Sequence, residues 1–309
     1  MAAAIPVMSL TWRETTETGE HLSQRSFWAR LAPFAFSIWA TSWLTNLFFM
    51  VDRYMIVHYS GLDADAALAL VGQYHTARLV PMLVLSFAHM LAGALMPYMS
   101  HEWEAHGRQA VADRLNLVLK VLSAVLLPGS AVLLLVSPWL FYLLGPGKFN
   151  MGLEVLPMTM CFCVISSLAC VSRNWLWCDE RAWLSNVAYL LGLVTCVALS
   201  LVWLPAYGLI GAAAATLVGN VATLAGMLIF NHRRGMPLER GTPLLMIAPL
   251  AIAGGATAAL IVSVLMLALT WRTEMVFSNA EKRQLIEVAT GYLAKYRPRS
   301  RNKLTRGAN

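Results

Sequence analysis

The stretch FFMVDRYMIV, residues 48–57, places Asp52 and Arg53 side by side within a run of apolar residues. The role of two adjacent charges depends on whether water or lipid surrounds the run. The whole chain is 58% hydrophobic and 13% charged, with a mean hydropathy of +0.61. Soluble domains carry about 25% charged residues. We therefore expect an integral membrane protein.

Seven apolar runs are long enough to cross a membrane as helices, because about 20 residues span the hydrocarbon core. They are Trp28–Met50, Ala67–Met99, Leu115–Leu144, Leu153–Trp177, Leu184–Leu204, Leu209–Phe230 and Leu244–Thr270. These runs predict an all-α membrane protein, a polytopic helical bundle. The sequence has no G-x-S-x-G, Walker-type or H-E-x-x-H motif, so no enzyme is expected. Its five cysteines form no C-x-x-C pair, and we expect no disulfide, metal site or cofactor.

Lys and Arg gather before the first run and in alternate connections, which predicts a cytoplasmic N-terminus. Seven full crossings would then place the basic tail outside. The pair Gly254-Gly255 divides the last run, and we predict a broken hairpin that returns the tail to the cytoplasm; a kinked full span with an external tail is the alternative. The predicted segments are a cytoplasmic start at 1–27, a six-helix lobe at 28–230, a basic loop at 231–243, the seventh apolar segment at 244–271 and a basic amphipathic tail at 272–309.

The tail contains the pattern S-x-x-E at Ser278 and Glu281, which is typical of a helix-starting capping box. In the fifth and sixth runs, small residues repeat every four positions around Gly192 and Gly219. This spacing lets membrane helices approach closely. The connection between the two runs is so short that they should be antiparallel neighbours. We also expect Asn186 and Asn220 to hydrogen-bond across that contact.

Polar residues form stripes at helical spacing in three runs. Asp52 and Arg53 end a polar wedge in the first run, Tyr74 and Arg78 share a face in the second, and Arg173 continues a stripe in the fourth. Charges at bilayer depth usually face a bundle interior or a water-filled cavity. The stripes thus predict that the arginines converge on one aqueous cleft. The alternative for Asp52 and Arg53 is a structural ion pair, within their helix end or with a neighbouring helix.

Other ionisable residues in the runs have weaker functional indications. His75 and His89 lie on the same face as Arg78, but a histidine on a helix face is more often a hydrogen-bonded packing residue than a proton relay. Arg173 and Lys120 lie near predicted cytoplasmic ends, where long basic side chains can extend to lipid phosphates.

Five segments suggest a family by their order along the chain: NLFFMVDRYMIVHYSG, LALVGQYHTARLVPML, LMPYMSHEW, NWLWCDERA and LPAYGLIGAAAATLVGN. Together they resemble the second half of bacterial polysaccharide flippases, which belong to the multidrug/oligosaccharidyl-lipid/polysaccharide exporter superfamily. The resemblance covers residues 28–243. It implies a fold of two six-helix lobes around a cleft that opens alternately to each side of the membrane, of which this chain matches the C-terminal lobe.

The resemblance implies a function and a location. The function would be flipping of an undecaprenyl-pyrophosphate-linked oligosaccharide for polysaccharide or lipopolysaccharide biosynthesis, by a multi-pass protein of the bacterial inner membrane. Arg53 and Arg78 would hold the pyrophosphate through charge-assisted bonds, next to Asp52 and with Arg173 behind them. Tyr74 and Trp177 would stack against sugars, although anchoring at the membrane interface is the commoner role of such aromatics.

Two other functions remain open at this stage. One is cation-coupled export of small molecules, and the other is a non-transporting membrane scaffold in polysaccharide assembly. A single lobe lacks the second wall of a cleft. The expected partners are therefore membrane lipids, a lipid-linked oligosaccharide and a separate chain that supplies the N-terminal lobe, unless the chain is a fragment or pairs with a second copy of itself. No nucleic-acid partner is expected.

Overall fold

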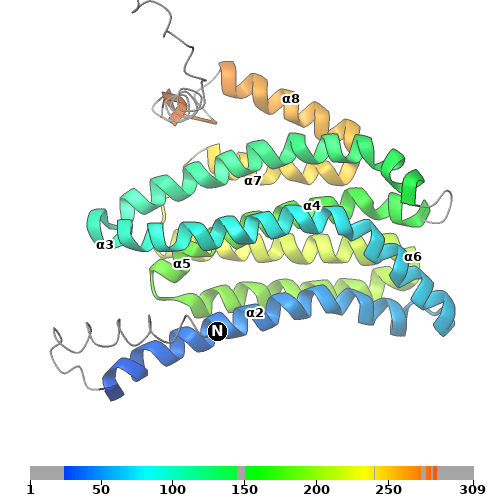
Figure 1. Cartoon of the computed structure of the whole chain (residues 1–309), viewed down its shortest axis with the longest axis horizontal. Coiled ribbons are helices and arrows are strands. Elements are labelled where there is room, and N and C mark those ends of the chain that lie inside the picture. Colours follow the sequence, from blue (N-terminus) through cyan, green and yellow to red (C-terminus); the bar gives the residue numbers. More distant parts are fainter. Residues whose placement is uncertain (1–23, 145–149, 240, 273–275, 280, 284–309) are drawn as a thin grey trace, which may run out of the picture.

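The computed structural model describes residues 24–144, 150–239, 241–272, 276–279 and 281–283. These residues form an all-helical bundle of nearly parallel and antiparallel rods (Figure 1). The helices are α2 (Gln24–Tyr59), α3 (Ala64–Leu144), α4 (Asn150–Ser172), α5 (Asn174–Cys178), α6 (Ala182–Arg233), α7 (Gly241–Ile247), the 3-10 helix η1 (Ala248–Gly254) and α8 (Ala256–Arg272). The predicted all-α fold class is confirmed.

Among the described residues, four helices are long and apolar enough to cross a membrane, and two of them reverse direction partway. Helix α3 turns at Gly107 and α6 turns at Gly208, where the positive φ angles of 83° and 58° suit glycine. The halves of α3 (64–106 and 108–144) and of α6 (182–207 and 209–233) then run antiparallel (Figure 1). The described part of the chain thus provides six rods of membrane-crossing length, in the order that the sequence predicts.

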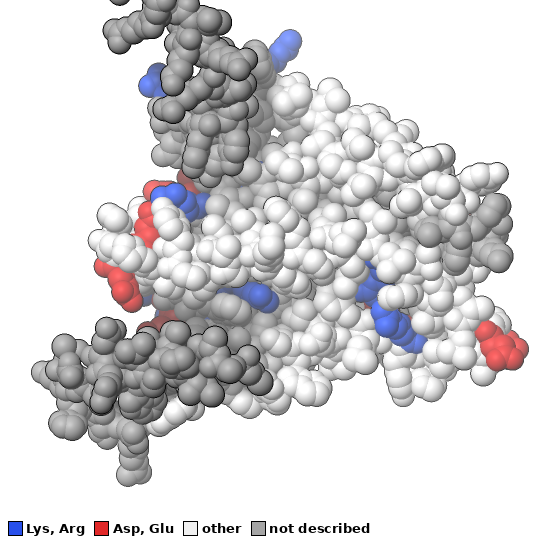
Figure 2. Space-filling view, in the orientation of Figure 1, with Lys and Arg blue, Asp and Glu red and all other residues white. Residues whose placement is uncertain are grey.

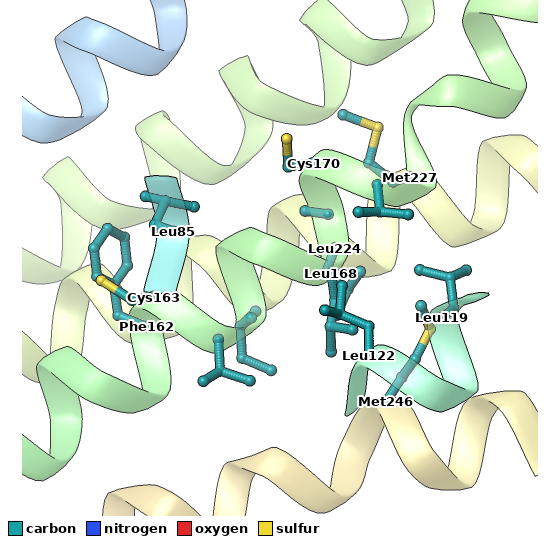
Figure 3. Close-up of a cluster of buried hydrophobic side chains, with 14 of the residues drawn as sticks. Leu85, Leu119, Leu122, Phe162, Cys163, Leu168, Cys170, Leu224, Met227 and Met246 are labelled. Carbon is teal, nitrogen blue, oxygen red and sulfur yellow. The ribbon is translucent and has the colours of Figure 1, made fainter. Parts of the chain in front are cut away.

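Helix α4 is the central rod of the bundle. Of its most apolar 18-residue stretch, 89% is buried, compared with 11% for the corresponding stretch of α2. Figure 3 shows part of this core, where α4 meets side chains from α3, α6 and α7. The α4 cysteines Cys161, Cys163 and Cys170 are buried there as small apolar residues. Helix α2 instead lies at one edge of the bundle and packs mainly on α6.

The two halves of α6 touch at the predicted glycine seam. A Cβ atom on Gly192 would lie 2.5 Å from the Gly219 carbonyl oxygen, so only glycine permits this approach. The predicted hydrogen bond between Asn186 and Asn220 is wrong. Asn186 instead contacts Thr41 of α2, and Asn220 accepts from Ser166 of α4, because each amide faces outward from the seam to another helix.

The last apolar run folds back on itself at Gly255, whose φ is 91°. Helices α7 and η1 run along the second half of α3, and α8 returns along it (Figure 1). Each arm is shorter than the roughly 20 residues of a full crossing. The reversal therefore brings the end of α8 back towards the end at which α7 begins.

Both ends of this hairpin are held by Lys120, whose side chain is buried on α3. Its Nζ contacts Glu239, just before the hairpin, and Glu281, after it, the latter at 2.9 Å. One turn away, Asn116 Nδ2 donates to the Pro237 carbonyl, and Asn116 Oδ1 accepts from the Thr242 hydroxyl. Lys120 thus forms an internal ion pair rather than reaching towards lipid phosphates.

Most of the predicted tail, 272–309, lies outside the described residues. Ser278 and Glu281 form the predicted capping box, since the Ser278 backbone N–H donates to the Glu281 carboxylate and the Glu281 N–H donates to the Ser278 hydroxyl.

Candidate functional site

Asp52 lies in the interior of the bundle, where three helices meet. The residue is 1% exposed, and the Arg78 guanidinium of α3 lies 2.9 Å from the carboxylate oxygen Oδ2. The Tyr74 hydroxyl, one turn earlier on α3, donates to the same oxygen at 3.0 Å. Oδ1 faces α6, where Thr216 Oγ1 lies 2.6 Å away and Cys196 Sγ lies 3.8 Å away. One carboxylate thus joins α2, α3 and both halves of α6.

Arg78 is 2% exposed and lies in an aromatic cage. Its guanidinium carbon is 5.4, 5.3 and 5.0 Å from the ring centres of Phe49, Tyr74 and Phe162. Aromatic faces attract cations at these distances. One guanidinium nitrogen, Nη2, has no hydrogen-bond partner among the described residues. The cage therefore supports the buried charge alongside its single ion pair.

Arg53 points away from this cluster, although it follows Asp52 in sequence. Successive helical residues differ by about 100° in direction, and the Arg53 side chain is exposed while Asp52 is buried. Its Nη2 lies 3.0 Å from His75 Nδ1 of α3. Asp52 and Arg53 are thus not paired with each other. Asp52 instead forms an ion pair with Arg78 of α3, as in the alternative prediction of a structural ion pair with a neighbouring helix.

Arg173 lies apart from both, at the break between α4 and α5. Its guanidinium carbon is 4.7 Å from the centre of the Trp177 ring, and Tyr189 of α6 lies next to it. Its Nε and the Trp177 indole N–H have no hydrogen-bond partners among the described residues. The three arginines are therefore in three different environments.

A cavity of about 1090 Å³ opens near the end of the lobe where α2 begins. Trp103, Trp177, Trp183, Glu104, Arg108 and Asp179 contribute to its lining. Arg53, Arg78 and Arg173 do not line this cavity. The expectation that these guanidinium groups converge on one aqueous hollow is corrected by this geometry, because Arg78 is enclosed by rings and a carboxylate.

Tyr74 also differs from its expected role. The ring is 1% exposed, and it packs under Arg78 while its hydroxyl binds Asp52. A sugar cannot stack on a ring that is enclosed in this way. Thr216, Cys196 and Phe49 complete the site and were not predicted from the sequence, since uncharged residues in apolar runs carry no signal of their own.

The sequence profile of the MatE family matches residues 38–202, more than half of the chain. The chain belongs to the MatE family. The match includes the part of α2 from residue 38 onward and all of α3 and α4, and thus both Asp52 and Arg78. MatE proteins are a transporter family rather than an enzyme family, and this member is a multi-pass membrane protein.

Two solved structures share the fold of this MatE protein. One is an outward-facing multidrug resistance MATE family transporter of the MOP superfamily, with 18% identity, a TM-score of 0.54, and coverage of 78% of this chain and 54% of its own. The other is a MOP superfamily transporter from Pyrococcus furiosus, described as having a binding pocket of reverse polarity, with 16% identity, a TM-score of 0.55, and coverage of 85% and 60%. No curated protein matches. The chain thus spans little more than half the length of these transporters.

Proposed function

We propose that the chain is one lobe of a cation-coupled exporter of small molecules, and that Asp52 is its coupling carboxylate. The observation that carries this proposal is the buried carboxylate that joins α2, α3 and α6 through Arg78, Tyr74 and Thr216. Membership of the MatE family and the likeness to a multidrug MATE transporter support an exporter over a dedicated glycolipid flippase.

A cation that binds Asp52 changes the contacts of all three helices at once. Neutralising the carboxylate removes the Coulomb attraction that holds α3 to α2 through Arg78. A ligand shifts a conformational equilibrium by its different affinity for the two states. A cation bound at Asp52 would therefore favour the state in which α2 and α3 are less tightly joined, and its release would favour the joined state.

Export by alternating access requires a second lobe that rocks against this one around a shared site. The second lobe would lie in a longer polypeptide, in a separate chain or in a second copy of this chain. Helix α2 is the least buried of the membrane-length helices. We propose that the second lobe faces α2 and the first half of α3, where Arg53 and His75 are exposed.

The test uses membrane vesicles from the cells that naturally make the chain, so that any second lobe is present. A pH gradient is imposed, a fluorescent organic cation is added, and its accumulation is compared between wild type and Asp52→Asn at equal protein levels. We expect accumulation driven by the gradient in the wild type and its loss in Asp52→Asn. Equal gradient-driven accumulation in both would overturn the proposal.

Flipping of a lipid-linked oligosaccharide in a bacterial inner membrane is a second candidate function. It is favoured by basic side chains that lie on the otherwise uncharged middle of the face between α2 and α3 (Figure 2). Arg53 is exposed, and Arg173 has a guanidinium nitrogen without a partner among the described residues. Both could bind a pyrophosphate through charge-assisted bonds.

The two candidates differ in which variant stops transport. Arg53→Ala combined with Arg173→Ala would abolish translocation of a polyprenyl-pyrophosphate glycolipid if that were the substrate, with Arg272→Ala, an exposed arginine at the end of α8, as control. Undiminished glycolipid translocation in the double variant would reject this second function and leave the first in place.

A further inference from the structure

The cavity at the end of the lobe where α2 begins is separate from the buried ion pair. The start of α2, the turn between the halves of α3 and the connection after α5 all lie at this end of the bundle (Figure 1). The cavity measures about 1090 Å³, and its lining includes Trp103, Trp177, Trp183 and the apolar α2 residues Leu31 and Phe34. Tryptophan is typical of the level at which a bilayer meets water. The cavity therefore has the aromatic lining expected where lipid headgroups lie.

Two carboxylates in the cavity lining are unpaired. Glu104 and Glu180 are exposed, and neither side chain forms an ion pair within the described part of the chain. The third acid of the lining, Asp179, is already neutralised, because its two oxygens accept from Arg108 and Arg234 at 2.8 Å each. Two negative charges thus line the cavity without a counter-charge.

Glu180 has a backbone conformation that suits glycine better than glutamate. Its φ is 54°, the one positive φ of a described residue other than glycine. It directly follows α5, where its N–H donates to the Trp177 carbonyl and the Arg181 N–H donates to the Leu176 carbonyl. This pair of hydrogen bonds is the helix ending in which glycine is usual. A strained conformation at such a position is an indication of function.

Glu104 is also placed against the local electrostatics. It lies in the last turn before Gly107, at the C-terminal end of the first half of α3. The unpaired carbonyl groups at such an end carry a partial negative charge, which favours basic rather than acidic side chains. A cation bound beside Glu104 would offset both the carboxylate and the helix end.

One positive group completes the lining. The Arg108 side chain is 58% exposed, and its guanidinium carbon lies 5.2 Å from the centre of the Trp103 ring. Its Nη2 donates to Asp179, which leaves other N–H groups of the guanidinium for a ligand. This guanidinium would repel a simple organic cation, and the two unpaired carboxylates would repel a simple anion. A ligand that carries both an ammonium and a phosphate matches both charges.

We propose that the cavity binds the headgroup of an ethanolamine phospholipid, with the ammonium at Glu104 and Glu180 and the phosphate at Arg108. A primary ammonium donates charge-assisted hydrogen bonds to carboxylates, which the methylated ammonium of choline cannot do. Leu31 and Phe34 provide an apolar surface for the glycerol and the first carbons of the acyl chains. The proposal is independent of the exporter, because it concerns a lipid bound at one end of the lobe and not the transported molecule.

The test uses Cys178, the half-buried thiol in the cavity lining, as a reporter, since the other four cysteines are buried. The purified full chain in a nonionic detergent is titrated with a short-chain phosphatidylethanolamine. The rate of Cys178 alkylation by a maleimide is followed by mass spectrometry of its peptide. We expect alkylation to slow with phosphatidylethanolamine, and to slow much less with short-chain phosphatidylcholine or phosphatidylglycerol.

Three outcomes would overturn the proposal. They are an unchanged alkylation rate with every lipid, equal protection by phosphatidylcholine or phosphatidylglycerol, and stronger protection by the organic cation ethidium than by phosphatidylethanolamine. The last outcome would make the cavity a site for organic cations.

Variants of Glu180 separate lipid binding from folding. Glu180→Gln should raise the phosphatidylethanolamine concentration for half-protection roughly tenfold, as for the loss of one charge-assisted hydrogen bond. Glu180→Gly should weaken protection equally, yet raise the midpoint of thermal unfolding of the lipid-free chain, because glycine adopts a positive φ without strain. Asp113→Asn, at an exposed acid outside the cavity lining, is the matched control and should leave protection unchanged. Full protection in both Glu180 variants would reject this carboxylate as a ligand of the ammonium.

Discussion

Two buried cations, Arg78 and Lys120, lie on the two halves of α3 and contrast in their surroundings. Arg78 pairs with one fully buried carboxylate inside a ring cage. Lys120 pairs with two carboxylates, Glu239 and Glu281, whose side chains are 38% and 12% exposed. The second arrangement joins the two ends of a hairpin through partly exposed carboxylates, whereas the first places a titratable group between three helices. The buried charge of Lys120 thus stabilises the hairpin, whereas the buried Asp52–Arg78 pair is a candidate conformational switch.

The largest expected effect comes from removing Arg78. Arg78→Ala leaves the Asp52 carboxylate buried without a counter-charge, which costs about 3–5 kcal/mol when a buried pair is broken from one side. The measurement is the free energy of unfolding in detergent. Asp52→Asn combined with Arg78→Ala should recover part of the loss, because the double variant has no buried charge. A double variant no more stable than Arg78→Ala would show that the pair is not coupled.

An intermediate effect is expected at Lys120. Lys120→Met keeps the buried stem and removes two ion pairs, but Glu239 and Glu281 can rehydrate, so the expected loss is about 1–2 kcal/mol. Limited proteolysis and amide hydrogen exchange of residues 241–272 should show a loosened hairpin. Arg272→Met, at the exposed end of α8, is the control. Unchanged hairpin exchange in Lys120→Met would mean that packing around Phe277 and Leu245 alone holds the hairpin.

The smallest effect on stability is expected at Arg53. Its side chain is exposed and contacts His75, so Arg53→Ala should change the free energy of unfolding by no more than about 0.5 kcal/mol. Thermal unfolding of Arg53→Ala and Arg78→Ala, measured side by side, compares the stability lost at the exposed arginine with that lost at the buried one. A loss comparable to that of Arg78→Ala would place Arg53 in the buried cluster after all.

Local sequence patterns predict much of this fold. Apolar runs give the rods, the spacing of Gly192 and Gly219 gives their contact, and Gly254-Gly255 marks the break at which the last run reverses. These features depend on residues close in sequence or on a simple periodicity. These features could be predicted from the sequence without knowing which helices are neighbours.

The site could be predicted only in part, because its residues are distant in sequence. Helical spacing places Tyr74 and Arg78 on one face, yet it does not tell which helix that face meets. It also groups Asp52 and Arg53 in one polar wedge, whereas the structure buries Asp52 and exposes Arg53. Thr216 lies 164 positions from Asp52. A threonine within AAAATLVGN resembles any other small residue of a packing seam, so its role follows only from the tertiary contact.

The most direct test of the central claim is hydrogen exchange of wild type at two pH values compared with Asp52→Asn, which mimics the neutral acid at any pH. The account predicts that acidification increases exchange in the peptides of α2 and α3 around Asp52 and Arg78, that Asp52→Asn shows this increase at neutral pH, and that the hairpin at 241–272 does not follow. Exchange around Asp52 that responds neither to pH nor to Asp52→Asn would contradict the account.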